Sequence, residues 1–397
     1  MAFPLPQGFR FSGVHCGIKS SSGKLDLSLV VSDVPAAAAG VYTQNLVFAA
    51  PVGWDRKLTP SGKIRAVVVN SGNANACTGA QGDRDTAEMA RLTAATIEAD
   101  AEQVLVLSTG VIGKFLPMQK ISAGIIAAQQ ALARSDAALV NAATGMLTTD
   151  TRHKLAGRQV QVAGGEITIT GMVKGAAMIG PNMATMLGVI LTDAALDPQT
   201  AQSMLTAAVA KSFNCISVDG HMSTNDTVLL LANGAAGPQQ LSSADLVLVG
   251  DAVREVAMEL AQAIPADGEG ATHLVTIDVT GCASHDEAHA IAKTVAESPL
   301  VKTAIAGGDP NWGRIVSAAG YAGVPFHPGR ITLRLNGTLL YAQGAPVEFD
   351  ATAVSKSIRD NRDTRIELQF DRGDTQLRFW TTDLTAEYVR LNADYTT

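Results

Sequence analysis

Apolar and polar positions change period along the chain, and these changes predict its elements. Apolar, β-branched runs at 64–69 and 104–107 predict strands, each followed by a polar loop that contains glycine. Helical patterns come next: Asp85 is placed to cap a helix through residue 97, and Pro117 to open one through residue 132. This alternation of strand and helix predicts an α/β fold.

A period of two replaces the helical pattern between residues 158 and 172, with Gly164-Gly165 at its centre, which predicts a hairpin. Further on, the patterns predict a strand at 186–192, helices at 198–212, 243–263 and 286–297, and two late hairpins that turn at Asn336-Gly337 and around Gly373. A boundary near 185–195 would divide the chain, so we expect two α/β domains with mixed sheets and packed helices.

Composition narrows the class of protein. A chain of 397 residues with 47% hydrophobic and 17% charged residues can bury a large core. A net charge of −7, 5% aromatic residues and no basic block argue against nucleic acid as a partner. No apolar stretch is long enough for a membrane helix, and the N-terminus lacks the features of a signal peptide. Four scattered cysteines fit a reducing compartment, so we expect a cytoplasmic protein.

The segment 174–192, KGAAMIGPNMATMLGVILT, is the most unusual stretch of the sequence. Its small residues allow other backbone to approach closely, and Ala184-Thr185 comes immediately before a predicted buried strand. A threonine hydroxyl there could be a nucleophile at the edge of a sheet. From residue types alone, a threonine that simply begins a strand is the more frequent case.

Other polar loops offer candidate chemistry. In STGVIG (108–113), Thr109 and Gly110 could supply an oxyanion hole or form an ordinary tight turn. In DGEGAT (267–272), Glu269 could face a cationic substrate or only solvent. Two further loops, VDGHMSTNDT (218–227) and GGDPNWGRI (307–315), could line a pocket or merely turn the chain.

Metal and conventional hydrolase sites are not predicted. His285 and His289 are four residues apart, but Asp286 stands where the zinc-protease pattern requires Glu. No GxSxG segment is present. We therefore expect neither a metal nor another cofactor.

Eight segments in a fixed order carry a family resemblance: VVNSGNANACTG, STGVIG, MLTTDTRHK, KGAAMIGPNMATML, SFNCISVDGHMSTNDT, DGEGAT, GGDPNWGRI and the terminal NADYTT. They lie between residues 68 and 397, and the resemblance itself covers the chain from about residue 10 to its end. In these segments the sequence resembles the ornithine acetyltransferase (glutamate N-acetyltransferase) family of bifunctional arginine-biosynthesis enzymes.

The resemblance implies that the chain cuts itself between Ala184 and Thr185. It would give an α chain (1–184) with the oxyanion-hole residues and a β chain (185–397) that begins at the nucleophile Thr185, assembled as α2β2. Thr109 and Gly110 match the family's oxyanion hole. The residues that match its substrate-binding set are Thr148, Lys174, Thr185, Glu269, Asn392 and Thr397.

Thr185 would act without a catalytic histidine, because an N-terminal amine can serve as its base near neutral pH. The implied ping-pong cycle moves acetyl from N2-acetylornithine to Thr185 and then to glutamate. We expect Lys174 to engage the α-carboxylate and Glu269 to face a cationic group of ornithine. The resemblance leaves open whether acetyl-CoA is a second donor.

Six positions depart from the family pattern. Three of them are conservative changes in the cleavage segment: Ala176, Ala177 and Gly180. His221-Met222 stands where an acidic residue and Thr are usual, and His273 where Lys is usual. These changes remove no proposed catalytic group, but they leave the fine substrate preference open.

Two other functions remain compatible with the sequence. An amidase with the same N-terminal threonine would use water as acceptor. A non-catalytic amino-acid-binding protein would need neither the Ala-Thr bond nor the oxyanion loop.

Overall fold

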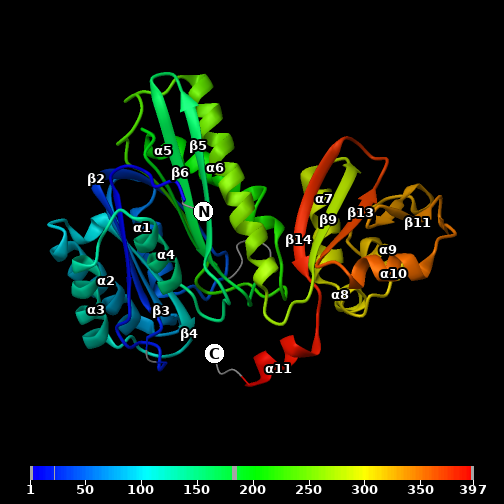
Figure 1. The fold of residues 1–397 in the computed structure, drawn as a ribbon, viewed down its shortest axis with the longest axis horizontal. Coiled ribbons are helices and arrows are strands. Elements are labelled where there is room, and N and C mark those ends of the chain that lie inside the picture. Colours follow the sequence, from blue (N-terminus) through cyan, green and yellow to red (C-terminus); the bar gives the residue numbers. More distant parts are fainter. Residues whose placement is uncertain (1–2, 22, 181–185, 395–397) are drawn as a thin grey trace.

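A computed structural model describes residues 3–21, 23–180 and 186–394. It contains two mixed sheets with packed helices, which lie side by side along the longest axis of the molecule (Figure 1). The predicted α/β class with mixed sheets is confirmed. No helix among the described residues is both long and apolar enough to cross a bilayer.

The first sheet has eight strands in the order β4-β3-β2-β8-β7-β6-β5, with β1 paired to β2. Only β3–β4 and β7–β8 are parallel. The strands are β1 (Phe9–Val14), β2 (Leu27–Tyr42), β3 (Ser61–Asn73), β4 (Val104–Val111), β5 (Lys154–Val162), β6 (Gly165–Lys174), β7 (Leu187–Thr192) and β8 (Thr227–Ala232).

Helices cover both faces of this sheet because successive strand residues point to opposite sides. On β3, Val67 and Val69 pack with α4 and β1, whereas Val68 packs with α2 and α3. Helices α5 and α6 cover the rest of that second face. The helices are α1 (Ala50–Leu58), α2 (Gly79–Thr96), α3 (Met118–Gln130), α4 (Asp136–Gly145), α5 (Pro198–Ala210) and α6 (Ser243–Ala263), with 3-10 turns η1 (Ala101–Gln103), η2 (Phe213–Cys215) and η3 (Pro265–Asp267).

The second sheet has six strands in the order β12-β11-β10-β13-β9-β14, of which only β9 and β13 are parallel neighbours. Its strands are β9 (Leu274–Cys282), β10 (Thr332–Leu335), β11 (Thr338–Ala342), β12 (Ala345–Pro346), β13 (Asp363–Gln369) and β14 (Thr375–Thr382). The accompanying helices are α7 (His285–Glu297), α8 (Pro299–Ala306), α9 (Trp312–Gly320), η4 (Pro328–Arg330) and α10 (Ala351–Arg359).

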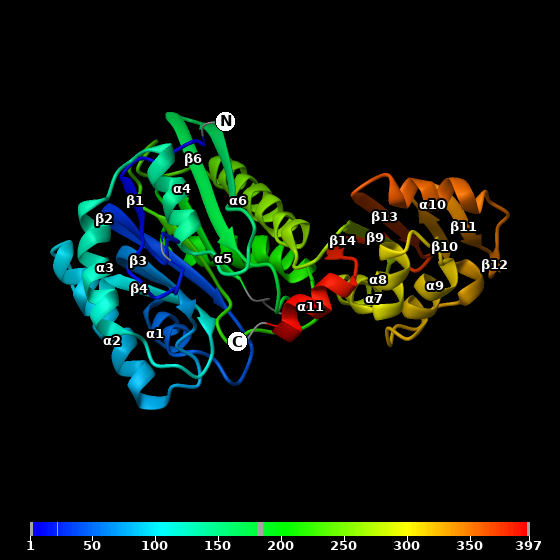
Figure 2. The same cartoon turned by 60° about the horizontal axis from the view of Figure 1, so that its bottom comes forward.

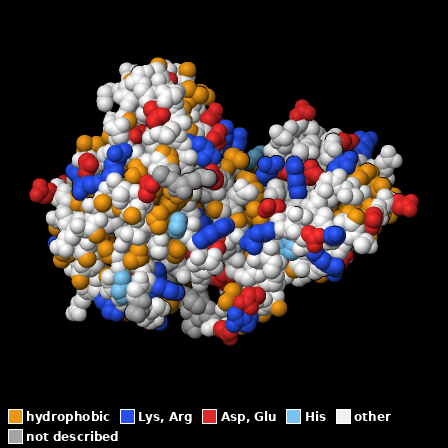
Figure 3. All heavy atoms as spheres, in the orientation of Figure 1, with side chains coloured by type: hydrophobic (Ala, Val, Ile, Leu, Met, Phe, Trp, Pro, Cys, Tyr) orange, Lys and Arg blue, Asp and Glu red, His pale blue; other side chains and the backbone are white. Residues whose placement is uncertain are grey.

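The last helix, α11 (Ala386–Asp394), follows β14 and runs back from the second sheet toward the first (Figures 1 and 2). In the space-filling view, positive and negative side chains are interspersed over the visible face (Figure 3). That face presents no continuous basic surface.

The predicted hairpins at Gly164-Gly165 and Asn336-Gly337 are confirmed as β5–β6 and β10–β11. The strand at 186–192 and the three later helices are confirmed too. The predicted start of α2 is wrong: the helix begins at Gly79, and Asp85 lies inside it, where its Oδ1 accepts a hydrogen bond from Gln81 Nε2 at 2.6 Å. An acidic residue within the first turns resembles a cap in sequence.

The predicted hairpin around Gly373 is wrong. Both of its strands form, but β9 lies between β13 and β14 and pairs with each. Residues 370–374 cross the end of β9, where the N–H groups of Phe370 and Arg372 donate to Thr280 O and Gly281 O at 2.9 and 2.8 Å. Gly281 makes this crossing possible, because a Cβ there would lie 2.0 Å from Phe370 O.

The predicted boundary at 185–195 does not separate the sheets. Strands β7 and β8 follow residue 185 but lie in the middle of the first sheet, between β6 and β2. All six residues of each are buried, as a central strand requires. The two sheets divide instead between Ala232 and Leu274, while the division into chains 1–184 and 185–397 stays a prediction about backbone cleavage.

Candidate active site

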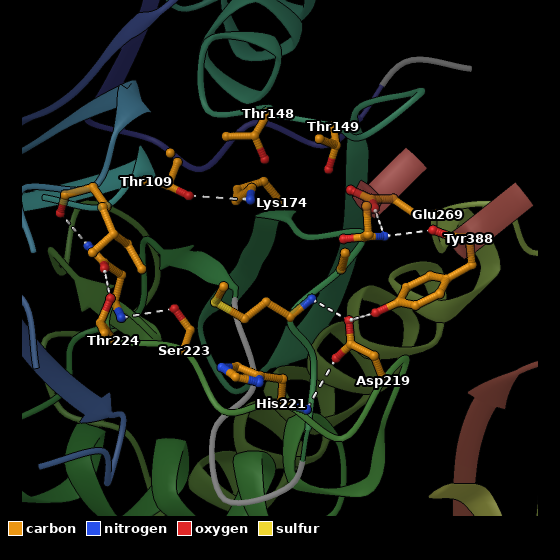
Figure 4. A pocket seen from close by; sticks show the side chains of 17 residues that line it. Thr109, Thr148, Thr149, Lys174, Asp219, His221, Ser223, Thr224, Glu269 and Tyr388 are labelled. Carbon is orange, nitrogen blue, oxygen red and sulfur yellow. Dashed lines mark hydrogen bonds between the residues drawn. The ribbon is translucent and has the colours of Figure 1, made fainter. Parts of the chain in front are cut away.

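A cavity of about 290 Å³ opens where α11 approaches the end of the first sheet (Figure 4). Six of the predicted site residues line it, although they come from five separate segments: Thr109, Gly110, Thr148, Lys174, Glu269 and Asn392. Thr109 and Lys174 lie on one side, Glu269 and Tyr388 on another, and His221 and Asp219 below them (Figure 4).

Ala184, Thr185 and Thr397 lie outside the described residues. The chain on either side of 181–185 is held by the loop that precedes β8. Ile179 O accepts from Val218 N at 2.8 Å, and Met186 N donates to Asp226 Oδ1 at 3.0 Å. The same loop contributes Ser223, Thr224 and Asn225 to the cavity wall, so the loop that holds both flanks of the predicted cleavage segment also lines the cavity.

Thr109 and Gly110 lie near the end of β4, which continues past the predicted end at residue 107 to Val111. Gly110 has φ +134°, a conformation that favours glycine, and a Cβ there would lie 2.3 Å from the backbone carbon of Gly72. The pairing register with β3 shifts at Gly72/Asn73, opposite this point. Such irregularities redirect the backbone at the end of a strand.

Asn225 ties this strand end to its surroundings. Its Nδ2 donates to Ser108 O at 2.8 Å and to Ala74 O at 2.7 Å. The STNDT segment therefore both lines the cavity and fixes the backbone next to Thr109.

Lys174, the last residue of β6, is buried and points at Thr109, to whose Oγ1 its Nζ donates at 3.4 Å. Burial lowers the pKa of Lys174, and the carboxylate of Asp150, 3.9 Å from Nζ, opposes the shift. No other lysine or arginine lines the cavity within the part of the chain that the structure describes.

Asp150 organises this side of the site, and sequence reasoning did not select it. Burial alone would raise its pKa, but Lys174 and Lys154 outweigh that effect and the pKa lies at about 2. Its carboxylate accepts from Lys154 Nζ at 2.7 Å, from Gly175 N at 2.6 Å and from Thr148 N at 3.1 Å. Asp150 thus fixes the backbone at Thr148 and just after Lys174. The only feature of the sequence that could have pointed to Asp150 is its place in the TTD segment.

Glu269 faces Lys174 across the cavity. Its backbone N–H donates to Ala176 O at 3.0 Å, and its Oε2 accepts from Asn392 Nδ2 of α11 at 2.9 Å. The predicted role of small residues is confirmed here and at Gly180, where a Cβ would lie 2.4 Å from the backbone of Gly220.

Asp219 and Tyr388 are site residues that sequence reasoning missed. Asp219 Oδ2 accepts from Met178 N at 2.7 Å and from Tyr388 Oη at 3.0 Å, while Oδ1 accepts from Ile179 N at 2.8 Å. The loop 218–227 therefore lines the pocket, which was one of its two predicted roles. His221, in the same loop, faces the cavity.

Several other candidates lie elsewhere. His273 is buried against Asp383, with Nδ1 2.8 Å from Oδ2, and does not line the cavity. Asn311 of GGDPNWGRI caps α9, and the residues before it, 308–310, line a different cavity. His289 Nε2 contacts Asn214 O at 2.9 Å, and the described residues contain no cluster of three groups able to hold a metal ion.

The arrangement suits a small molecule that carries both charges. Lys174 offers a cation beside the end of β4, and Glu269 and Asp219 offer carboxylates on the opposite walls. A model of one protein family matches residues 10–397.

The chain belongs to the ArgJ family. An arginine biosynthesis bifunctional protein ArgJ from Rhodopirellula baltica is 47% identical over 99% of this chain and 96% of its own length. The corresponding protein from Symbiobacterium thermophilum is 46% identical over 99% and 98%.

A solved chain of the ArgJ protein from Bacillus halodurans is 36% identical, with a TM-score of 0.50, and the match covers 51% of this chain and 96% of that one. ArgJ membership confirms the predicted family, the ornithine acetyltransferase type of acyltransferase in arginine biosynthesis. The roles of individual residues are a separate question.

Proposed function

We propose that this chain cuts itself before Thr185 and then transfers acetyl from N2-acetylornithine to glutamate through an acetyl-Thr185 intermediate. The observation that carries the proposal is the convergence of six predicted residues from five segments on one cavity. Ala177 and Met178, shortly before residues 181–185, line that cavity, and Thr185 is covalently linked to Met186, which is hydrogen-bonded to the loop that also lines it.

In the proposed first half-reaction, the Thr185 hydroxyl attacks the acetyl carbonyl of acetylornithine. The N-terminal amine takes the hydroxyl proton and gives it to the departing ornithine amine. Thr109 and Gly110 stabilise the negative charge that develops on the carbonyl oxygen. Glutamate then attacks acetyl-Thr185 by the reverse route and leaves as N-acetylglutamate.

Lys174 is the proposed partner of the α-carboxylate, because no other lysine or arginine among the described residues lines the cavity. Glu269 is the proposed partner of ornithine's side-chain ammonium, on the opposite wall. Thr148 would donate to or accept from the same substrate, with Asn392 and Thr397 closing the site from the C-terminal end.

The length of the solved relative supports cleavage. The match spans 51% of this chain but 96% of the Bacillus halodurans chain, which is therefore about half as long. A cut before Thr185 would give a second chain, 185–397, that is also about half as long as the uncut chain. The two products would stay associated, because β7 and β8 of the second are hydrogen-bonded between β6 and β2 of the first.

We further propose a cytoplasmic α2β2 enzyme. All four cysteines are free in the structure, which fits a reducing compartment.

An assay with two acceptors tests the function. The purified protein should release ornithine from acetylornithine rapidly only when glutamate is present, and N-acetylglutamate should form in equal amount. Acetate release at a rate that does not depend on glutamate would identify an amidase instead. No turnover with either acceptor would favour a binding protein.

Deleting residues 392–397 should lower transfer tenfold or more and leave self-cleavage largely intact. The deletion removes the amide of Asn392 that holds Glu269 Oε2 at 2.9 Å, and one such charge-assisted hydrogen bond is worth ~1.4 kcal/mol or more. Acetate release should rise relative to transfer, because the tail also excludes water from acetyl-Thr185. The ratio of acetate to N-acetylglutamate measures this effect.

Arg390→Gln is the matched control on the same helix, since Arg390 is exposed and pairs with Glu387 and Asp394 outside the cavity. It should transfer at the wild-type rate. Unchanged transfer in the deletion variant would show that the C-terminal residues are not part of the active site.

A further inference from the structure

The active-site cavity receives two substrates with side chains of opposite charge, if the proposed acetyl-transfer cycle operates. Acetylornithine belongs to a family of substrates with a cationic side-chain end, for which Glu269 is the proposed partner. Glutamate brings a side-chain carboxylate instead, and the negative charge of Glu269 would repel it in the same position. The acceptor therefore needs a second group in the cavity wall.

The amide and phenol donors of this wall are already bound to protein groups. The side-chain amide of Asn225 donates to two backbone carbonyls, at 2.7 and 2.8 Å. The amide of Asn392 donates to Glu269 Oε2 at 2.9 Å and to a backbone carbonyl at 3.0 Å. Tyr388 Oη donates to Asp219 at 3.0 Å. None of these groups is free to bind a second carboxylate without breaking a contact.

Lys174 and His221 are the two described residues of the wall whose side chains can carry a positive charge. Lys174 faces Thr109 and Asp150, and it is the proposed partner of the α-carboxylate that both substrates share. His221 lies below Lys174 (Figure 4). Its imidazole makes no hydrogen bond or ion pair with any residue that the structure describes. His221 therefore offers the cavity an uncommitted ring.

Backbone contacts fix the position from which the His221 side chain extends. His221 N donates to Asp219 Oδ1 at 3.2 Å, and a Cβ at Gly180 would lie 2.8 Å from the same nitrogen. Gly220, just before it, has φ +73°, which favours glycine. The ring takes no part in these contacts, and the residue is exposed. The side chain can therefore be replaced while the loop keeps its backbone contacts.

An imidazole can bind a carboxylate in either of its charge states. The neutral ring donates one hydrogen bond, whereas the protonated ring donates two and adds a positive charge. A carboxylate beside the ring favours the protonated form. The chemistry of His221 thus matches the side-chain end of glutamate and not the ammonium end of ornithine.

We propose that His221 binds the side-chain carboxylate of the acceptor and makes the site prefer glutamate to an uncharged amino acid of the same shape. This role rests on the proposed function. In the first half-reaction the ammonium group of ornithine faces Glu269. In the second, glutamate places its α-carboxylate at Lys174 and its side chain at His221. His221 is therefore a specificity residue of the second half-reaction and takes no part in breaking or forming bonds.

The acceptor preference of the purified protein tests the proposal, with glutamine as the uncharged analogue of glutamate. His221→Ala should lower kcat/KM for glutamate about tenfold, the loss expected for one charge-assisted hydrogen bond, and leave kcat/KM for glutamine within twofold. The value for acetylornithine should also stay within twofold, because in a ping-pong cycle it reports the first half-reaction alone. His221→Lys restores a cation and should keep the preference for glutamate.

His285→Ala is the matched control, because it removes an exposed imidazole at the start of α7, outside the cavity. It should leave all three kcat/KM values unchanged. The proposal is overturned if the wild type uses glutamine as well as glutamate, if His221→Ala keeps the preference, or if its kcat/KM falls equally for all three substrates. Normal acetylornithine–glutamate transfer by the wild type beside any of these results would leave the proposed function standing. Absence of that transfer would reject the function itself.

Discussion

Thr185→Ala should give a single uncut chain and lower acetyl transfer by ~10⁴-fold or more. The same hydroxyl is proposed to attack the preceding carbonyl during cleavage and the acetyl group during turnover, so its loss removes both reactions. Losses of this size are typical when a nucleophile is deleted. Intact-mass analysis measures the first effect, and ornithine release in the presence of glutamate measures the second.

Thr185→Ser is the control, because it keeps a hydroxyl at the same position. It should still mature, at a reduced rate, and form an acetyl-enzyme with the mass of one added acetyl group. The new N-terminus of the wild-type second chain should be Thr185. A different N-terminal residue, or transfer by the alanine variant at the wild-type rate, would contradict the assignment of the nucleophile.

Elements with a local signal could be predicted from the sequence. The Asn336-Gly337 turn supplies the positive φ angles that a two-residue hairpin needs, at +47° and +81°. Helix α6 starts where Ser242 and Asp245 form a capping box. In both cases the residues that decide the structure are within four positions of each other.

Strand partners could not be predicted in the same way. Nothing near Gly373 indicates that β9, far earlier in the chain, occupies the space between β13 and β14. Likewise, the apolar run of β7 signals burial but not a place in the middle of the first sheet. Pairing of this kind depends on contacts between distant segments, so a boundary placed by local composition divided one sheet.

The site residues also divide into those with a local sequence signal and those that only the fold brings together. Lys174 and Glu269 could be selected because their segments carry the family resemblance, and the structure brings both to one cavity. Asp219 and Tyr388 could not, because their importance comes from a hydrogen bond across 169 positions of sequence. Asp150 acquires its role from Lys154, Lys174 and two backbone N–H groups that only the fold assembles around it.

The charges of the site also explain how the ammonium group of Lys174 can be buried. A buried ammonium is costly unless a partner compensates it, and breaking such a pair is strongly destabilising. Asp150 supplies the compensation for Lys174 and is itself shared with Lys154. The ammonium group that is proposed to bind the substrate carboxylate is therefore already oriented by Asp150 and Thr109.

Thr109→Val should slow both maturation and acetyl transfer by ~10²–10³-fold, the usual effect of losing one oxyanion donor. Valine keeps the shape and β-branching of threonine but removes the hydroxyl, which in the resting site accepts from Lys174 Nζ at 3.4 Å. Both reactions pass through a tetrahedral intermediate with negative charge on the former carbonyl oxygen, so one substitution should affect both. The rate of chain cleavage and the single-turnover rate of acetyl-enzyme formation are the two measurements.

Thr109→Ser is the control for the hydroxyl and should retain most of both rates, whereas Gly110→Ala tests the backbone beside it. Gly110 has φ +134° and no room for a Cβ, which would lie 2.3 Å from Gly72, so alanine must displace the strand end that carries the proposed donors. Thermal unfolding separates this local displacement from general loss of stability, because Thr109→Val should unfold near the wild-type temperature. Wild-type rates of both reactions in Thr109→Val would contradict the oxyanion role and indicate that the STGVIG segment is only a structural turn.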